Sequence, residues 1–163
     1  MAMGDLVLLE SKGTPVIDAL QRGGIEQRLR QIRLDLPTAE LDRILKVNGK
    51  IAGGTYQFAV PRAEKISENG MEVPPSMGMA TALNFQPTGN GRAAITGDFV
   101  MIGSEVNPVI CVLRGGGIAV TALHSHMLDE TPRLFFMRFW ANEDAVKLAM
   151  TLRRALDQMN VKK

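Results

Sequence analysis

The sequence predicts an α+β fold in which a mixed, mostly antiparallel sheet carries helices packed on one face. Two strand-like runs flank the turn PTGNG at residues 87–91, which is typical of a β-hairpin. A helix-spaced apolar pattern covers residues 145–159, and a helical stretch at 104–114 separates two further strand-like runs. From residue 38 the predicted order is therefore α-β-β-β-α-β-β-α.

The first elements follow from local signals. Thr38 precedes a short helical run with Glu40 in its first turn, so we expect a helix capped by Thr38 and ending at Leu45. Residues 51–60 alternate between apolar and polar side chains and predict one strand. The segment 62–78 is rich in glycine, proline and charge and is expected to be a long loop.

The hairpin in the middle of the chain leads into a crossover. Its two strands are expected at residues 79–86 and 92–101. A helix that begins at Ser104 or Asn107 ends at the glycine run 115–117. We expect the next strand, residues 118–126, to be parallel to the strand before this helix through a right-handed crossover, which makes the sheet mixed.

The last elements carry the strongest patterns. Residues 133–140 predict an aromatic strand, and Asn142 is expected to cap the final helix. The apolar side chains of that helix share one face and are expected in the core: Ala145, Leu148, Ala149, Leu152, Ala155, Leu156 and Met159.

Part of the chain is present twice. Residues 4–27 align with residues 97–120 without gaps, and the identities include the pairs Gly4/Gly97, Asp5/Asp98, Pro15/Pro108 and Gly23/Gly116. We interpret residues 1–37 as the remnant of a duplicated first domain with its linker, and residues 38–163 as the main domain. Because half a unit cannot bury its own apolar face, residues 1–37 are expected to dock on the main sheet or to form a homo-dimer.

Composition excludes several classes of protein. A hydrophobic content of 45% with 22% charged residues is typical of a globular protein with a core. The 19 basic residues are spread among 17 acidic ones, which argues against nucleic-acid binding. The single cysteine, Cys111, rules out an internal disulfide and a cysteine-based zinc cluster. No run approaches the roughly 18 apolar residues of a membrane span, and the sequence as written lacks a signal peptide, so we expect a cytoplasmic location.

The two histidines are the strongest candidates for chemistry. His124 and His126 alternate onto the same face at the end of a predicted strand, where two imidazoles can converge on one divalent ion. Glu105 is the preferred third ligand, because Lys12 replaces it in the copy that lacks histidines. These residues predict a zinc site. The alternative is one hydrogen-bonded core histidine beside one solvated turn histidine.

Other charged residues could complete such a site. Asp98 is a possible ligand or a partner that fixes an imidazole tautomer, although Asp5 at the equivalent place suggests a structural role. Arg138 lies among bulky apolar neighbours and could pair with Glu105, with Asp98 or with a small anionic ligand, or be solvated. Glu72 is a further candidate acid. Copper is less favoured than zinc, although Met71, Met77, Met79 and Met127 could supply thioethers.

No motif supports nucleophilic catalysis, so the sequence leaves two hypotheses. The first is a divalent-metal or small-anion site that polarises a ligand or activates water for hydrolysis. The alternative is a non-catalytic ligand-binding or homo-oligomeric assembly module. The sequence does not decide whether the protein is an enzyme.

One long stretch resembles a known family. The runs GMEVPPSMGMATALNFQPTGNGRAAITGDFVMIGSEVNPVI and GIAVTALHSHMLDETPRLFFMRFWA are similar to the LppY/LpqO-related family of bacterial proteins. The resemblance implies an uncharacterised function, a domain usually carried twice, and relatives that are often exported. Relatives typically have a third histidine at the place of Arg138, so the resemblance implies that one possible metal ligand is absent here.

Overall fold

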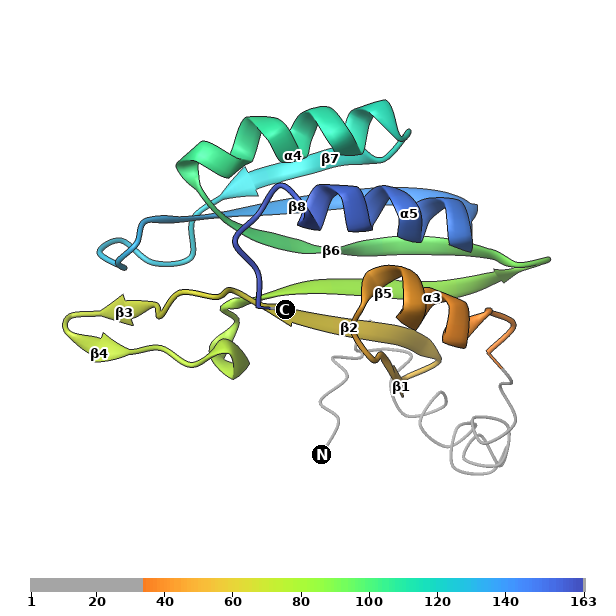
Figure 1. Ribbon diagram of the computed structural model, residues 1–163, viewed down its shortest axis with the longest axis horizontal. Helices are drawn as coiled ribbons and strands as arrows, with labels where there is room; N and C mark the ends of the chain where they lie inside the picture. The colour runs from red at the N-terminus through yellow and green to blue at the C-terminus, as the bar shows by residue number, and fades with distance from the viewer. Residues whose placement is uncertain (1–33, 163) are drawn as a thin grey trace, which may run out of the picture. The chain divides into compact units, whose positions relative to one another are not determined.

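The computed structural model describes residues 34–162, which form a six-stranded sheet with helices over one face (Figure 1). The elements are α3 (Thr38–Leu45), β1 (Lys50–Ala52), β2 (Thr55–Pro61), β3 (Ser67–Glu68), β4 (Met71–Glu72), the 3-10 turn η2 (Pro75–Met77), β5 (Ala80–Gly89), β6 (Arg92–Ile102), α4 (Gly103–Gly115), β7 (Ala119–His124), β8 (Leu134–Asp144) and α5 (Ala145–Leu156). The α+β class with a mostly antiparallel sheet is confirmed. The predicted remnant at residues 1–37 lies almost wholly outside the described residues.

Strand order corrects one expectation. The sheet runs β1-β2-β5-β6-β8-β7, and each neighbouring pair in it is antiparallel. β6 and β7 do point the same way, but β8 lies between them, so the direct parallel pair that would make the sheet mixed is absent. The reason is the long register of β8, which pairs with the whole of β6 from Arg92 opposite Asp144 to Ile102 opposite Leu134.

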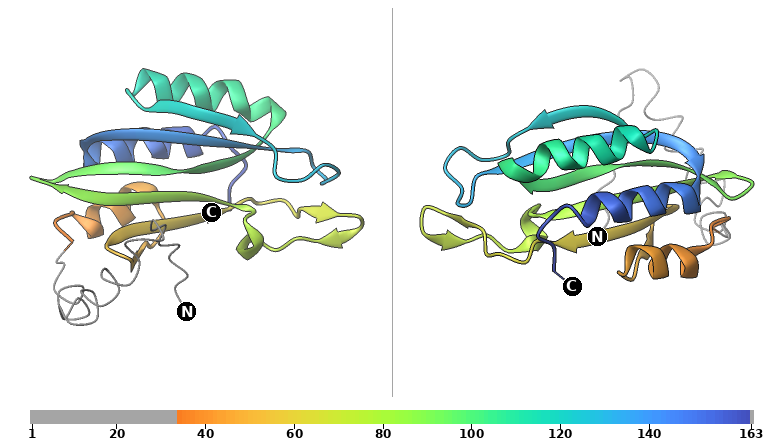
Figure 2. Two further views of the ribbon diagram at one scale, coloured as in Figure 1. Left: turned by 180° about the vertical axis from the view of Figure 1, so that it is seen from behind. Right: turned by 45° about the horizontal axis from the view of Figure 1, so that its top comes forward.

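The main core lies between the sheet and the helices. Ile95, Phe99 and Met101 of β6 are fully buried on the helix side, together with Leu148 and Leu152 of α5. Figure 2 shows the helices on this side of the sheet. The predicted core face of α5 is confirmed, apart from Met159, which is only partly buried.

Three helix starts differ from the sequence expectation. Asp144, and not Asn142, caps α5 by accepting a hydrogen bond from the Lys147 amide, because β8 continues through Asn142. Pro37 occupies the N-cap of α3 without a side-chain hydrogen bond. The helix after β6 begins at Gly103, so neither Ser104 nor Asn107 is its N-cap.

Two segments contain more regular structure than expected. Residues 51–60 form the hairpin β1–β2, in which Gly53 and Gly54 adopt φ values of +56° and +79°. Such a glycine pair suits a two-residue hairpin turn. The expected loop at 62–78 contains the β3–β4 hairpin, which projects beyond the end of the sheet (Figure 1).

A second, smaller core lies on the sheet face away from the helices. Ile66, Val73 and Met79 from the β3–β4 region pack against Val100 and Phe136 of the sheet. Backbone hydrogen bonds between Ser67 and Thr131, at 2.9 and 2.8 Å, join this region to the loop after β7. Within residues 34–162 no helix has the length and apolar composition to cross a bilayer.

Candidate functional site

The candidate site lies on the open face of the sheet, next to the smaller core. Phe136 of β8 stands between Val100 of β6 and His124 of β7 in the strand register. Two residues further along β8, Arg138 stands opposite Asp98 of β6. The antiparallel register therefore brings His124, Arg138 and Asp98 onto one face, because positions two apart on a strand point the same way.

The structure brings the two imidazole rings together. The Nε2 atoms of His124 and His126 lie 3.1 Å apart. His126 follows the end of β7 and stacks on the Phe136 ring, with centroids 3.5 Å apart and an angle of 9° between the planes. The aromatic strand thus supplies a flat support that fixes one ring of the pair.

Charges around the pair favour a neutral His126. Desolvation of the ring lowers the pKa of His126, and the nearby His124 and Arg138 lower it further. Asp98 and Glu130 act in the opposite direction, but the pKa stays below its usual value. A neutral imidazole keeps a nitrogen lone pair, so His126 can bind a metal ion or accept a hydrogen bond at neutral pH.

Arg138 and Asp98 form an ion pair beside the histidines. Nη2 of Arg138 lies 3.2 Å from Oδ2 of Asp98, and the arginine side chain is 57% exposed. Asp98 Oδ1 is buried and has no hydrogen-bond partner among residues 34–162. The pair therefore leaves the exposed guanidinium donors of Arg138 available to a ligand.

Glu105 is engaged elsewhere. Its Oε2 accepts from Nη1 of Arg62 at 2.7 Å and from the Ile102 amide at 3.0 Å. Its Oε1 accepts from Nη2 of Arg62 at 3.0 Å and from the Asn160 amide at 2.8 Å. Both oxygens are thus used inside the fold. Within residues 34–162 no group of three or more His, Cys, Asp or Glu side chains is placed to hold a metal ion.

The other predicted residues are dispersed. Glu72 pairs with Lys65 on the β3–β4 hairpin, at 2.8 Å. Met71 and Met77 are 76% and 64% exposed, whereas Met79 is buried in the smaller core. Met127 also packs against this core, which contains Phe136. Of the four thioethers, two are therefore exposed and two lie in the smaller core.

Sequence reasoning missed the two residues that shape the histidine loop. Glu130 is buried and accepts from the Leu134 amide at 2.9 Å and from Arg133 at 3.2 Å. Arg133 also donates to the carbonyl oxygens of Met127 and Leu128, both at 2.9 Å. The spacing of a glutamate three residues before an arginine, across Pro132, was the available signal.

The family can be assigned from the matched region. Residues 39–158 match the model of a family described as Domain of Unknown Function (DUF1259). The chain belongs to this family. The match extends from α3 to just beyond α5, so the DUF1259 domain includes the histidine pair, Arg138 and the Arg62–Glu105 pair. No curated protein and no solved structure matched the chain.

Proposed function

We propose that His124 and His126 of this DUF1259 domain bind a divalent transition-metal ion, for which zinc is the best fit. The supporting observation is the 3.1 Å separation of their Nε2 atoms. With metal–nitrogen bonds of about 2.05 Å, one ion contacting both atoms would subtend an angle of roughly 98°. That angle is close to the angle in tetrahedral coordination, so the rings need little movement to accept an ion.

An anionic ligand would complete the coordination. Two neutral imidazoles leave the charge of a divalent ion uncompensated, and Arg138 adds a second exposed cation on the same face. A carboxylate or phosphate group could bind the ion and Arg138 together, since both recognise oxygen anions. A water molecule at an open position would be activated for hydrolysis, which is the reaction class such a site supports.

Zinc is favoured over copper(I) by the surroundings. Imidazole suits both metals, but copper(I) is selected by soft sulfur ligands. The exposed Met71 and Met77 belong to the β3–β4 region and not to the histidine loop. The pair itself supplies nitrogen, and the carboxylates of Asp98 and Glu130 act on His126, so the charged surroundings suit zinc.

Calorimetric titration of zinc into tag-free protein, stripped with a chelator, tests the proposal. We expect one ion per chain for the natural sequence, and loss of stoichiometric binding in both His124→Ala and His126→Ala. Asp129→Asn is the matched control, because it removes an exposed acid from the same loop without touching either ring. Absence of binding, or binding unchanged in both histidine variants, would overturn the proposal.

We also propose that residues 4–27 descend from a second copy of this domain, as in the LppY/LpqO-related proteins. The support is that their counterparts, residues 97–120, comprise one continuous unit: the second half of β6, all of α4 and the start of β7. A duplication of a whole β-α-β unit is what domain repetition would leave behind.

A further inference from the structure

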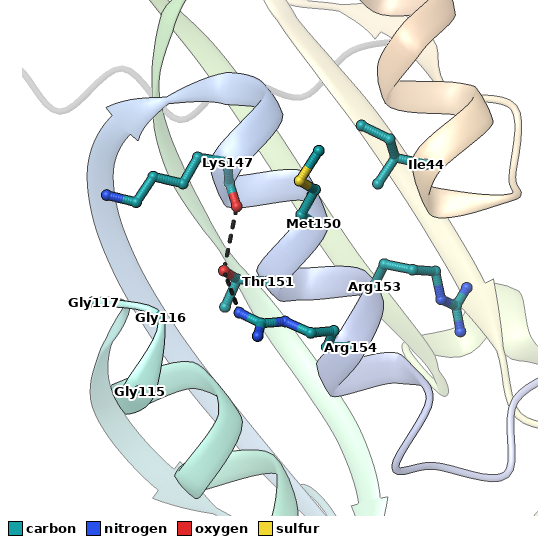
Figure 3. A pocket seen from close by; sticks show the side chains of 9 residues that line it. All are labelled: Ile44, Gly115, Gly116, Gly117, Lys147, Met150, Thr151, Arg153 and Arg154. Carbon is teal, nitrogen blue, oxygen red and sulfur yellow. Dashed lines mark hydrogen bonds between the residues drawn. The ribbon is translucent and has the colours of Figure 1, made fainter.

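A cavity of about 820 Å³, broadly open to solvent, lies on the helix side of the sheet, on the opposite face from the histidines. Figure 3 shows α5 as its floor, with the glycine run 115–117 at the end of α4 on one side. Ile44 of α3 lines the other side. Neither the family match nor the metal proposal gives this cavity a role.

The lining carries positive charge only. Lys147, Arg153 and Arg154 line the cavity, and among residues 34–162 no carboxylate does. Arg153 is already committed, since it donates to the Leu45 carbonyl oxygen at 2.9 Å and pairs with Asp157 at 2.8 Å. The charge that a ligand could use therefore comes from Lys147 and Arg154.

These two cations keep free donors. Lys147 pairs only loosely with Glu143, at 3.7 Å. Among residues 34–162 the Arg154 side chain makes one hydrogen bond, to Oγ1 of Thr151 at 3.3 Å. Cations near the end of α4 could simply offset its negative dipole. Neither side chain donates to a carbonyl oxygen of α4, however, so their N–H groups remain available to an anion.

The glycine turn brings bare backbone to the cavity. A Cβ at Gly116 would lie 2.2 Å from Cγ2 of Thr151, so glycine lets the turn pack against α5. Gly117 adopts a φ of +79°, which favours glycine at a helix end. Neither reason applies to Gly115, because a Cβ there would meet no atom of residues 34–162 within 4 Å. Its bare backbone leaves room for a ligand.

An apolar surface adjoins the charged one. Met150 is 52% exposed, and Ile44 stands across from it on α3 (Figure 3). In the same view Lys147 and Arg154 extend on the glycine side of α5. The cavity thus has a cationic half and an apolar half, which fits a ligand with a charged head and a hydrocarbon body.

We propose that this cavity binds a small organic anion, whose carboxylate or phosphate pairs with Arg154 and Lys147 while its apolar body lies over Met150 and Ile44. The cations match the charge of the head group, and the exposed thioether and isoleucine match the body. The site is independent of the metal site, because the sheet separates them.

Titrations of the full chain followed by amide NMR spectra test the proposal with four probes. Hexanoate and hexyl phosphate should give saturable shifts of the Gly115, Gly116 and Gly117 amides, and their relative affinities identify the preferred head group. Hexanol lacks the charge and inorganic phosphate lacks the body, so each should bind at least about threefold more weakly. The proposal would be overturned if hexanol bound as tightly as hexanoate and hexyl phosphate, or if neither of those two anions gave a saturable shift.

Substitutions of Arg154 and Lys147 test whether these two side chains bind the anion. Arg154→Gln and Lys147→Gln should each weaken binding of the better anion about threefold. Lys50→Gln is the matched control, because it removes one exposed charge from the edge strand β1 and should leave binding unchanged. His126→Ala should also leave it unchanged, which separates this site from the metal site. Natural affinity in both cavity variants would contradict the assignment.

Discussion

At the scale of single residues, Arg62 and Glu105 form the most enclosed ion pair of the described residues. Their side chains are 1% and 9% exposed. Arg62 ends the β2 region, Glu105 opens α4, and the Asn160 amide joins them from the C-terminal segment. The pair therefore ties three distant segments together. A salt bridge between groups so far apart in sequence cannot be recognised from spacing.

Glu105→Gln should lower the free energy of unfolding by about 2 kcal/mol at pH 7, because it removes the more buried of the two carboxylates that pair with Arg62 and leaves only Glu64. Burial by itself would raise the pKa of Glu105, but hydrogen bonds from Arg62, Asn160 and Ile102 outweigh it and lower the pKa below 4.5. A carboxylate with a lowered folded-state pKa stabilises the fold above its unfolded pKa, and this stability is lost as pH falls through the folded value.

Urea unfolding at several pH values measures this effect. The difference between the natural protein and Glu105→Gln should be constant above about pH 5 and shrink at lower pH. Glu72→Gln is the control, since Glu72 belongs to an exposed pair whose loss costs little. If the difference in free energy of unfolding between the natural protein and Glu105→Gln did not depend on pH, the charge of Glu105 would not be what stabilises the fold.

At the histidine site, some features could be predicted from the sequence and others could not. The spacing of two predicted that His124 and His126 converge, although His126 lies just beyond the end of β7, where the loop sets its position. The partner of Arg138 follows only from the β6–β8 register, which sets it opposite Asp98. The stacking of His126 on Phe136 depends on the fold of the loop after β7, which no local pattern specifies.

At the scale of elements, the contact between β5 and β6 depends on one glycine. A Cβ at Gly97 would lie 1.8 Å from the carbonyl oxygen of Ala82 on β5 and 3.1 Å from the Phe139 ring. Gly97→Ala must therefore push β5 and β6 apart in the middle of the sheet. We expect it to lower stability by about 3 kcal/mol.

Thermal or urea unfolding of Gly97→Ala checks this prediction, with Gly115→Ala as the matched control. Gly115 is helical and its added Cβ would contact nothing, so that variant should be as stable as the natural protein or about 0.5 kcal/mol more stable. If the two variants had equal stability, the close approach of β5 and β6 would not be as described.

Elements were well predicted where the pattern was long. The apolar face of α5 and the hairpin β5–β6 are both as expected. The short β1–β2 hairpin was missed because its two strands share one alternating run, which only Gly53 and Gly54 interrupt. The start of α5 was shifted because tertiary pairing prolonged β8 past its predicted end.

At the scale of the whole molecule, residues 34–162 contain a complete core. The main cluster runs from α3 through the sheet to α5, and Leu34 and Leu36 pack against it. A chain reduced to residues 34–163 should therefore unfold in one cooperative transition, with a midpoint close to that of the full chain. Residues 1–37 are predicted to dock on the main sheet or to pair two chains, so we expect the shorter chain to be monomeric, and a dimer of the full chain would support pairing.

Calorimetry and light scattering on both chains check these two outcomes. Failure of the shorter chain to fold would contradict the independence of the domain. The same number of chains per particle in both proteins would contradict pairing through residues 1–37. That result would not affect the metal and anion proposals.

The sequence by itself determined the class of fold, the order of most elements, the core face of α5 and the neighbourhood of the two histidines. These features depend on periodicity and on residues close together in the chain. The tertiary structure decided the place of β8 between β6 and β7, the engagement of Glu105 by Arg62, and the cationic cavity over α5. Each of those joins segments far apart in sequence, and the energy that selects them comes from packing and pairing across the whole domain.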